Sequence, residues 1–296
     1  MEKSATATDS AQRCHLCGAT SKTFNNIDDM LARKVDASGI KFGLSTLHAW
    51  IRLFECLLHL SYKLDIKKWQ IRTDEERETL NRNKIRIRQG FKEKLALDVD
   101  SPKQGYGSSN DGNTARRFFE NSAVSSEITG VDEEIITRFR VILQTLLSGY
   151  AIDVDNFQVY TLETARKYVN RYPWYYMPTT VHKILIHSPH IISSALLPIG
   201  QLSEDAQEAR NKDIRKYREG FSRKSSRENT MQDVFNHLLV SSDPYITSLR
   251  NLPRKKLKHL SADVISLLSP PDASTHLDVS TQAPDEDDSA DSDACE

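Results

Sequence analysis

Two pairs of potential metal ligands lie far apart in this 296-residue chain. Cys14 and Cys17 occur in CHLCG, and His182 and His187 occur in HKILIH about 165 residues later. Two thiolates and two imidazoles are a ligand set that a structural, tetrahedral Zn²⁺ takes, with no open position for a substrate. If the four residues meet, one zinc ion joins both ends of a domain and builds the fold without doing chemistry.

The spacing alone leaves other interpretations open. A CxxC pair also occurs without a metal, and the histidines could be ordinary core or surface residues. Residues five apart lie about 140° apart around an ideal α-helix, so one histidine is expected near a helix end. His15 and His190 are the substitute ligands that the sequence offers.

The remaining composition is typical of an intracellular chain. The N-terminal stretch MEKSATATDSAQR is polar, and the apolar stretch near IISSALLPIG is too short to span a bilayer. Four cysteines with one close pair do not resemble a secreted disulfide framework. We therefore expect no membrane association and a location in the nucleus or, alternatively, the cytoplasm.

Charge is distributed unevenly along the chain. Residues 271–296 carry nine of the 41 acidic residues and no Lys or Arg, so the first 270 residues hold 40 basic and 32 acidic residues. An acidic tail of this composition cannot bury enough apolar surface to order itself. We predict a disordered N-terminus at 1–10, a helical domain at 11–262 and a disordered acidic tail at 263–296, which could contact basic proteins.

Apolar residues recur at helical spacing through nearly the whole body, and no alternating strand pattern is convincing. Thr73 and Glu76 have the spacing of a capping box, and Asp155 and Thr230 are expected near the starts of later helices. Residues 100–113 are rich in Gly, Ser, Asn and Asp and predict a loop. The fold class is therefore all-α, with helices expected within 44–64, 73–97, 113–121, 131–150, 155–169, 179–192, 203–221 and 230–240.

Two smaller segments have alternative interpretations. The aromatic residues of RYPWYYMP, at 171–178, are expected to form a packed corner beside the prolines, with stacking on an unpaired base as the alternative. The basic stretch RNLPRKKLKH, at 250–259, could be a nuclear-import signal, a phosphate-binding stretch or a solvated linker.

The helix expected after Ser203 changes from acidic to basic within two turns. Glu204, Asp205 and Glu208 come first. The macrodipole and i, i+4 pairing explain this order on an ordinary solvated helix. In the functional alternative, a carboxylate holds Mg²⁺ and the basic face lies along a nucleic-acid backbone. The candidate DNA-binding residues are Arg210, Lys212, Arg215, Lys216 and Arg218.

The run SEDAQEARNKDIRKYREGFSRKSS, preceded by HKILIHSPHII, resembles the C-terminal part of the V(D)J recombinase catalytic subunit and its relatives, the Transib and RAG-like transposases. In that family a CxxC followed by a DAT-like stretch and an HxxxxH pair bind one structural zinc, and this chain has CHLCGAT and HKILIH in the same order. NDGNTARRFFEN resembles the family's GN-containing segment. The resemblance spans roughly residues 11–250.

The resemblance implies specific roles. Cys14, Cys17, His182 and His187 would be the zinc ligands. Glu208, three residues before Asn211, would be the last carboxylate of a DDE triad, and Glu204 is the weaker candidate. The fold implied is the helical insertion and terminal Glu helix of an RNase H-like transposase.

Family members carry two catalytic aspartates upstream of the CxxC, on strands for which the thirteen residues before Cys14 leave no room. A two-metal site needs several carboxylates, so Glu208 alone would not hold Mg²⁺ or Mn²⁺ for strand cleavage. We expect a truncated or domesticated transposase relative that is inactive alone, binds DNA and can form a homodimer. The alternative is a non-enzymatic, zinc-stabilised DNA-binding or protein-interaction module.

Overall fold

The computed structural model describes residues 13–103, 107–202, 205–243, 245–246 and 260–270. These residues are mostly helical, which confirms the predicted helical class. The elements are α1 (Ile27–Ala32), α2 (Ala37–Ile40), α3 (Thr46–Ser61), α4 (Asp74–Leu95), β1 (Pro102–Lys103), β2 (Gly107–Ser108), α5 (Gly112–Glu120), α6 (Ser122–Thr129), α7 (Glu133–Leu147), α8 (Val154–Arg171), α9 (Thr179–His182), the π-helix η1 (Lys183–His187), α10 (Ser188–Ser194), the 3₁₀ helix η2 (Ile199–Leu202), α11 (Asp205–Gly220), α12 (Arg227–Ser242) and α14 (Ala262–Ile265).

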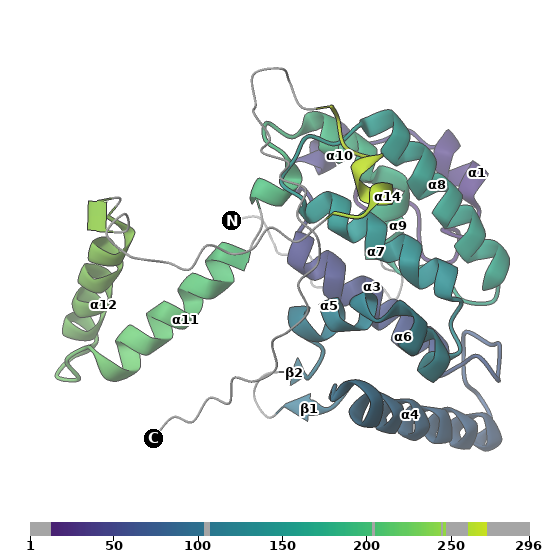
Figure 1. Cartoon of the computed structure of the whole chain (residues 1–296), viewed down its shortest axis with the longest axis horizontal. Helices are drawn as coiled ribbons and strands as arrows, with labels where there is room; N and C mark the ends of the chain where they lie inside the picture. Colours follow the sequence, from purple (N-terminus) through teal and green to yellow (C-terminus); the bar gives the residue numbers. More distant parts are fainter. Residues whose placement is uncertain (1–12, 104–106, 203–204, 244, 247–259, 271–296) are drawn as a thin grey trace, which may run out of the picture.

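Helices α3 and α7 form the centre of the body, and the other helices surround them (Figure 1). Leu53, Phe54 and Leu57 of α3 are fully buried because they recur at three- and four-residue spacing on one face. Phe54 meets Phe118 of α5 with ring centroids 5.0 Å apart. This aromatic and aliphatic core connects α3 to α5, α7 and α9, and it fixes the elements that carry the histidine pair.

Helix α4 lies along the lower edge of the body in Figure 1 and begins with the predicted capping box. The Thr73 side chain accepts from the Glu76 N–H, and the Glu76 carboxylate accepts from the Thr73 N–H. Ile87 and Phe91 bury the inner face of the helix. The other faces are mostly polar, as the charged sequence of the helix predicts, apart from the exposed Ile85.

Residues 100–113, predicted as a loop, also contain the short antiparallel pair of β1 and β2. Asp111 then begins α5, because its side chain accepts from the N–H of Thr114 at 2.9 Å. The all-α prediction therefore omits one antiparallel pair of two-residue strands within the described residues.

Two predicted helix starts are shifted in the structure. Asp153, not Asp155, caps α8, since it is extended and accepts from the Asn156 N–H at 3.0 Å. Ser226 caps α12 in the same way, so Thr230 lies inside that helix and not at its start. Each observed cap is a polar residue a few positions before the expected one. In each helix the cap is the residue whose side chain accepts from a free N–H group of the first turn.

The body continues past the boundary expected at residue 262. Val264 and Leu267 are buried, α14 packs on α7, and Leu268 forms a bridge with Ile152. Apolar side chains thus attach residues 260–270 to the body. The predicted disordered segments at 1–10 and 271–296, and the basic stretch at 250–259, lie outside the described residues.

Helices α11 and α12 form a hairpin that lies apart from the other helices in Figure 1. Their described residues pack mainly on each other. The ring of Tyr217 stacks on His237 with centroids 5.0 Å apart, and Arg223 forms an ion pair with Asp233 at 2.9 Å. Polar and aromatic contacts therefore hold this hairpin together, with few buried aliphatic side chains.

Candidate metal centre

The cysteine pair lies on a tight turn at the start of the described chain. The N–H of Gly18 donates to the carbonyl of Cys14 at 2.7 Å, and the Cys14 N–H donates to the carbonyl of Ala19 at 2.8 Å. Gly18 has φ = 66°, a left-handed conformation that costs little without a Cβ. Leu16 is fully buried between the cysteines and anchors the turn. The sequence CHLCG therefore presents both sulfur atoms to the same side.

The histidine pair is aligned by a local change of helix type. On an α-helix, residues five apart would point in directions about 140° apart. Residues Lys183–His187 form a π-helix, whose wider turn pairs residue i with residue i+5. The ring centroids of His182 and His187 are consequently 4.8 Å apart. The sequence suggested that one histidine would lie near a helix end. In the structure a widened turn within a continuous helical segment brings the two rings together instead.

The four predicted ligands meet in space. The Nε2 atoms of His182 and His187 are 3.1 Å apart, and the Cys17 Sγ lies 3.4 Å from the His182 Nε2. One ligand atom from each residue, Cys14 included, lies within 4.8 Å of all the others. A tetrahedron with Zn–S of about 2.3 Å and Zn–N of about 2.0 Å has edges of about 3.3–3.8 Å. The four donor atoms could therefore hold one tetrahedral ion with small adjustments.

Residues next to the cysteine turn fix the imidazoles in place. Phe24, which is fully buried, stacks on the ring of His182 with centroids 3.9 Å apart. The Asn25 side chain donates to the carbonyl of Tyr175 and accepts from the N–H of Met177, each at 3.0 Å. These contacts attach the N-terminal segment to the residues that lead into α9. The sequence alone did not point to Phe24 or Asn25, since neither belongs to a recognisable motif.

The protonation states of the imidazoles suit metal binding. Burial lowers the pKa of His182 to about 3 and that of His187 to about 4, and in each case a neighbouring imidazole lowers it further. Both rings are therefore neutral at pH 7, as a metal ligand must be. Each Nδ1 is buried without a hydrogen-bond partner among the described residues, and the two Nε2 atoms are the ring nitrogens that face the cluster.

The cysteine side of the cluster requires deprotonation. Burial, followed by the neighbouring Cys14, raises the pKa of the Cys17 thiol to about 11, although a backbone hydrogen bond from Ala19 opposes the shift. A bound divalent ion would supply the positive charge that stabilises the thiolate. The donor set thus fits a metal such as zinc, whose four protein ligands would leave no position for a substrate.

Within the described residues, this cluster is the one group of three or more His, Cys, Asp or Glu side chains close enough to share a metal. The substitute ligands lie outside it. His15 packs its ring edge against Phe42, and His190 is exposed.

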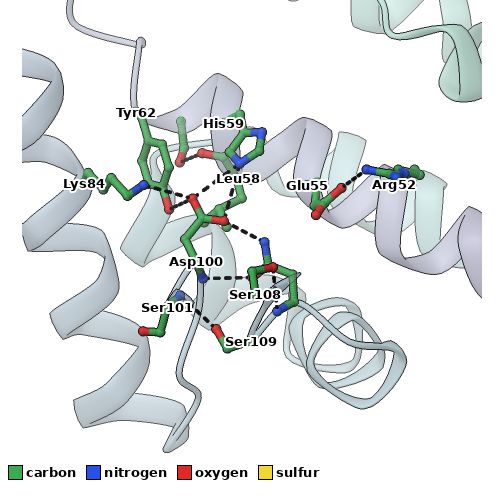
Figure 2. A network of polar contacts seen from close by, with 12 residues as sticks. Arg52, Glu55, Leu58, His59, Tyr62, Lys84, Asp100, Ser101, Ser108 and Ser109 are labelled. Atoms are coloured by element: carbon green, nitrogen blue, oxygen red, sulfur yellow. Dashed lines mark hydrogen bonds and ion pairs between the residues drawn. The ribbon is translucent and has the colours of Figure 1, made fainter. Parts of the chain in front are cut away.

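A second polar cluster, which the sequence did not predict, lies around Asp100 (Figure 2). Its carboxylate, 10% exposed, accepts from Tyr62 at 3.2 Å and from Asn110 at 2.6 Å. His59 and Lys84 lie 3.3 and 3.4 Å from the same carboxylate. Asp100 also has φ = 53°, and its N–H donates to the Asn110 side chain at 2.8 Å.

The Asp100 cluster is suited to holding elements together. Burial works to raise the pKa of Asp100, but hydrogen bonds from His59 and Asn110 and the charge of Lys84 outweigh it, so the pKa is lowered. An ionised carboxylate with every oxygen occupied is a poor proton acceptor. We read this cluster as the connection between α3, α4 and the loop before α5.

The candidate DNA-binding residues lie on α11, on which the structure gives them different surroundings. Arg210 donates to the Leu238 carbonyl and to Ser242, which ties α11 to α12. Lys212, Arg215, Lys216 and Arg218 are exposed. Glu208 belongs to the first turns of α11, but its side chain lies outside the described part of the chain, and Glu204 lies outside the described residues altogether.

The aromatic segment forms a packed corner. Tyr172 and Tyr175 are each 4% exposed, and Tyr175 meets Trp69 with ring centroids 5.0 Å apart. This confirms the packing interpretation for these two side chains. The segment therefore supports the N-terminal residues that carry the cysteines, through Asn25.

Comparison with known proteins adds no relative. No family model matches the chain, and no curated protein matches it either. Among the described helices, none combines the length and the apolar composition needed to cross a bilayer.

Proposed function

We propose that this chain is the helical part, stabilised by a bound metal, of a DNA transposase-recombinase of the RAG-like and Transib kind. In this proposal α11 binds DNA and Glu208 supplies the last carboxylate of a DDE triad. Strand cleavage and transfer then require an RNase H-like part that contributes two aspartates and binds Mg²⁺ or Mn²⁺ together with Glu208. The proposed location is the nucleus.

One observation carries the proposal. The resemblance assigned a shared zinc to Cys14, Cys17, His182 and His187, and these side chains meet although 165 residues separate Cys17 from His182. Four such residues have little reason to converge in a buried cluster unless they act together. The metal would hold the cysteine turn against the histidine helices and so stabilise the fold. Its four protein ligands would leave no position for a reacting water.

A second candidate, a non-enzymatic interaction module, is favoured by a different observation. Phe235 and Leu239 of α12 are both 55% exposed, which is unusual for a surface that contacts only DNA and water. The same metal cluster would then stabilise a binding scaffold.

The decisive experiment joins residues 11–250 to the aspartate-bearing half of an active transposase of this kind. We expect the chimera to nick DNA with Mg²⁺ or Mn²⁺. Glu208→Gln should abolish nicking while zinc content and the unfolding transition stay unchanged, because the substitution is nearly isosteric. Glu204→Gln is the matched control and should retain activity.

Other outcomes would redirect the assignment. Activity that survives Glu208→Gln but is lost with Glu204→Gln would place the carboxylate at the weaker candidate. A folded, zinc-loaded chimera that never nicks DNA would contradict the transposase proposal and favour the interaction module. This chain alone should show no nicking, because one carboxylate cannot position two metal ions.

A further inference from the structure

Three apolar side chains form an exposed stripe along α12. Met231, Phe235 and Leu239 follow one another at four-residue intervals and are 53%, 55% and 55% exposed. Side chains four residues apart lie one above the other on a helix, so the three are contiguous. Val234 and Ser241, the buried residues of α12, lie on a different face. We call Met231, Phe235 and Leu239 the α12 stripe.

The surroundings of the α12 stripe carry very little charge. Residues 229–242 contain one Asp and no Glu, Lys or Arg, although 27% of the whole chain is charged. The single carboxylate, Asp233, is paired with Arg223 at 2.9 Å. Gln232 and Asn236, which are uncharged and hydrogen-bonded to each other at 3.1 Å, lie beside the stripe. Residues 229–242 offer no Lys or Arg to a phosphate backbone, which favours a protein partner over a nucleic acid.

The described residues of the hairpin contact few other elements. Helices α11 and α12 pack mainly on each other, away from the body (Figure 1). Short helices gain most of their stability from tertiary packing of an apolar face. One apolar face of α12 is turned to solvent instead, a feature that marks interaction sites in folded proteins.

The α12 stripe is complementary to itself. Met231 and Leu239 have similar volumes and lie four residues on either side of Phe235. In an antiparallel pair, Phe235 of one copy therefore meets Phe235 of the other, and each Met231 meets a Leu239. Such a contact is isologous, uses one surface twice and closes after two copies. No like charges oppose each other within it.

We propose that two copies of this chain associate through their α12 stripes, antiparallel about a two-fold axis near Phe235, so that the two hairpins form a four-helix layer. The inference is independent of the proposed transposase function. It would hold equally for a recombinase part and for a non-enzymatic module.

The available area sets the strength of the association. Three large side chains that are just over half exposed present about 300 Å² of apolar surface per copy. With about 60% of a buried interface apolar, two stripes and their polar flanks would bury about 1,000 Å² in total. This value lies at the lower end of specific interfaces, so the dimer should dissociate in the micromolar range.

The test uses the full, zinc-loaded chain in sedimentation equilibrium from about 1 to about 100 µM, a range that brackets such an affinity. We expect the mass to rise with concentration from 33.7 kDa towards twice that value. Phe235→Ser should remain at 33.7 kDa throughout, with unchanged zinc content and circular dichroism. Ile85→Ser, which removes a side chain 65% exposed on α4, is the matched control and should associate as the unmodified chain does.

Cross-linking tests the antiparallel register. In a Cys295→Ser background, Phe235→Cys should form a disulfide between copies, because residue 235 faces its own equivalent across the axis. Val240→Cys, 56% exposed but off the stripe, should not. A monomer at the highest concentration, a dimer that persists in Phe235→Ser, or equal cross-linking at both positions would overturn the proposal.

Discussion

His182 and His187 owe their readiness for metal to burial. Removed from water, both imidazoles stay neutral through the physiological range, with pKa values of about 3 and about 4. The Cys17 thiol, with a pKa raised to about 11, is protonated in the same range. Protons that compete with the metal near neutral pH therefore come from the cysteine side.

This asymmetry predicts how zinc affinity depends on pH. Between about pH 6 and about pH 8, affinity should rise by about one to two powers of ten per pH unit, since thiols must release protons on binding and the folded histidines have none to lose. Competition with a zinc chelator at several pH values measures the slope. A slope near zero would contradict a protonated Cys17, and a slope near four would contradict neutral histidines.

Removal of single ligands tests the cluster itself. Cys17→Ser, which is nearly isosteric, and His187→Ala should each reduce zinc content from about one per chain to near zero and abolish cooperative unfolding, because structural zinc binding is folding free energy. His15→Ala and His190→Ala change the same residue types nearby and should keep the metal. Elemental analysis and thermal denaturation give both readouts. Full zinc content in Cys17→Ser would show that Cys17 is not a ligand.

The Asp100 carboxylate predicts a second stability effect, one that needs no metal. Asp100→Asn should lower the free energy of unfolding by about 1–3 kcal/mol, because it replaces a largely buried carboxylate, which accepts from Tyr62 and Asn110 and faces the half-exposed Lys84, by a neutral amide. Asp155→Asn, on an exposed carboxylate of α8, should change it by less than about 0.5 kcal/mol. Denaturant titration at pH 7 measures both. Equal losses of unfolding free energy in Asp100→Asn and Asp155→Asn would mean that the contacts of Asp100 do not stabilise the fold.

The pH dependence of that effect has a definite sign. The pKa of Asp100 is lowered in the folded protein from its ordinary value of 3.8. Its contribution is therefore present above pH 3.8 and is lost as the pH falls from there towards the folded value. The difference in the free energy of unfolding between the unmodified chain and Asp100→Asn should therefore become smaller as the pH falls below 3.8.

At the scale of single elements, the start of α8 gives a comparison between two aspartates two residues apart. Asp153→Ala should lower the free energy of unfolding by about 0.5–2 kcal/mol, since its side chain accepts from the Asn156 N–H. Asp155→Ala should have an effect below about 0.5 kcal/mol. Urea denaturation of the two variants decides between them. A larger loss at Asp155 would support the sequence-based start of the helix.

The elements also show where sequence reasoning succeeds. The capping box at Thr73 and Glu76 was predictable because both partners lie within one helical turn and bind only local backbone. The choice of Asp153 over Asp155 was not, since both residues satisfy the same local rule for an N-cap. The π-helix at Lys183–His187 has no sequence signature of its own. It becomes intelligible only once the two imidazoles must share one centre.

At the scale of the whole molecule, the types of the four metal ligands were predictable from residue chemistry, and only the family resemblance predicted that they meet at one site. Residue chemistry named Cys14, Cys17, His182 and His187, whereas their convergence depends on Phe24 and Asn25, whose contacts span about 150 residues. Glu208 remains a prediction from resemblance. The Asp100 cluster was missed because its partners come from three separate segments of the chain.

The basic face of α11 predicts salt-dependent DNA binding. Replacing Arg215, Lys216 and Arg218 with Ala should reduce the slope of log affinity against log salt by about two to three, because each phosphate contact contributes about 0.9. Filter binding from about 50 to about 200 mM salt measures the slope. A triple variant of Arg52, Arg77 and Lys94, each in an ion pair on another helix, removes the same charge and should leave the slope unchanged. Affinity that ignores salt would exclude a phosphate-binding α11.

The long separation of the two ligand pairs has a consequence for synthesis of the chain. The cysteine turn leaves the ribosome before the histidine pair, and His182 is the 165th residue made after Cys17. At about 5–20 residues per second, the thiols wait for roughly 8–33 s without their histidine partners. During that interval Cys14 and Cys17 are open to oxidants and to other metal-binding proteins in the cell. The two thiols of the nascent chain therefore stay reactive until the histidine pair follows and the fold can enclose them.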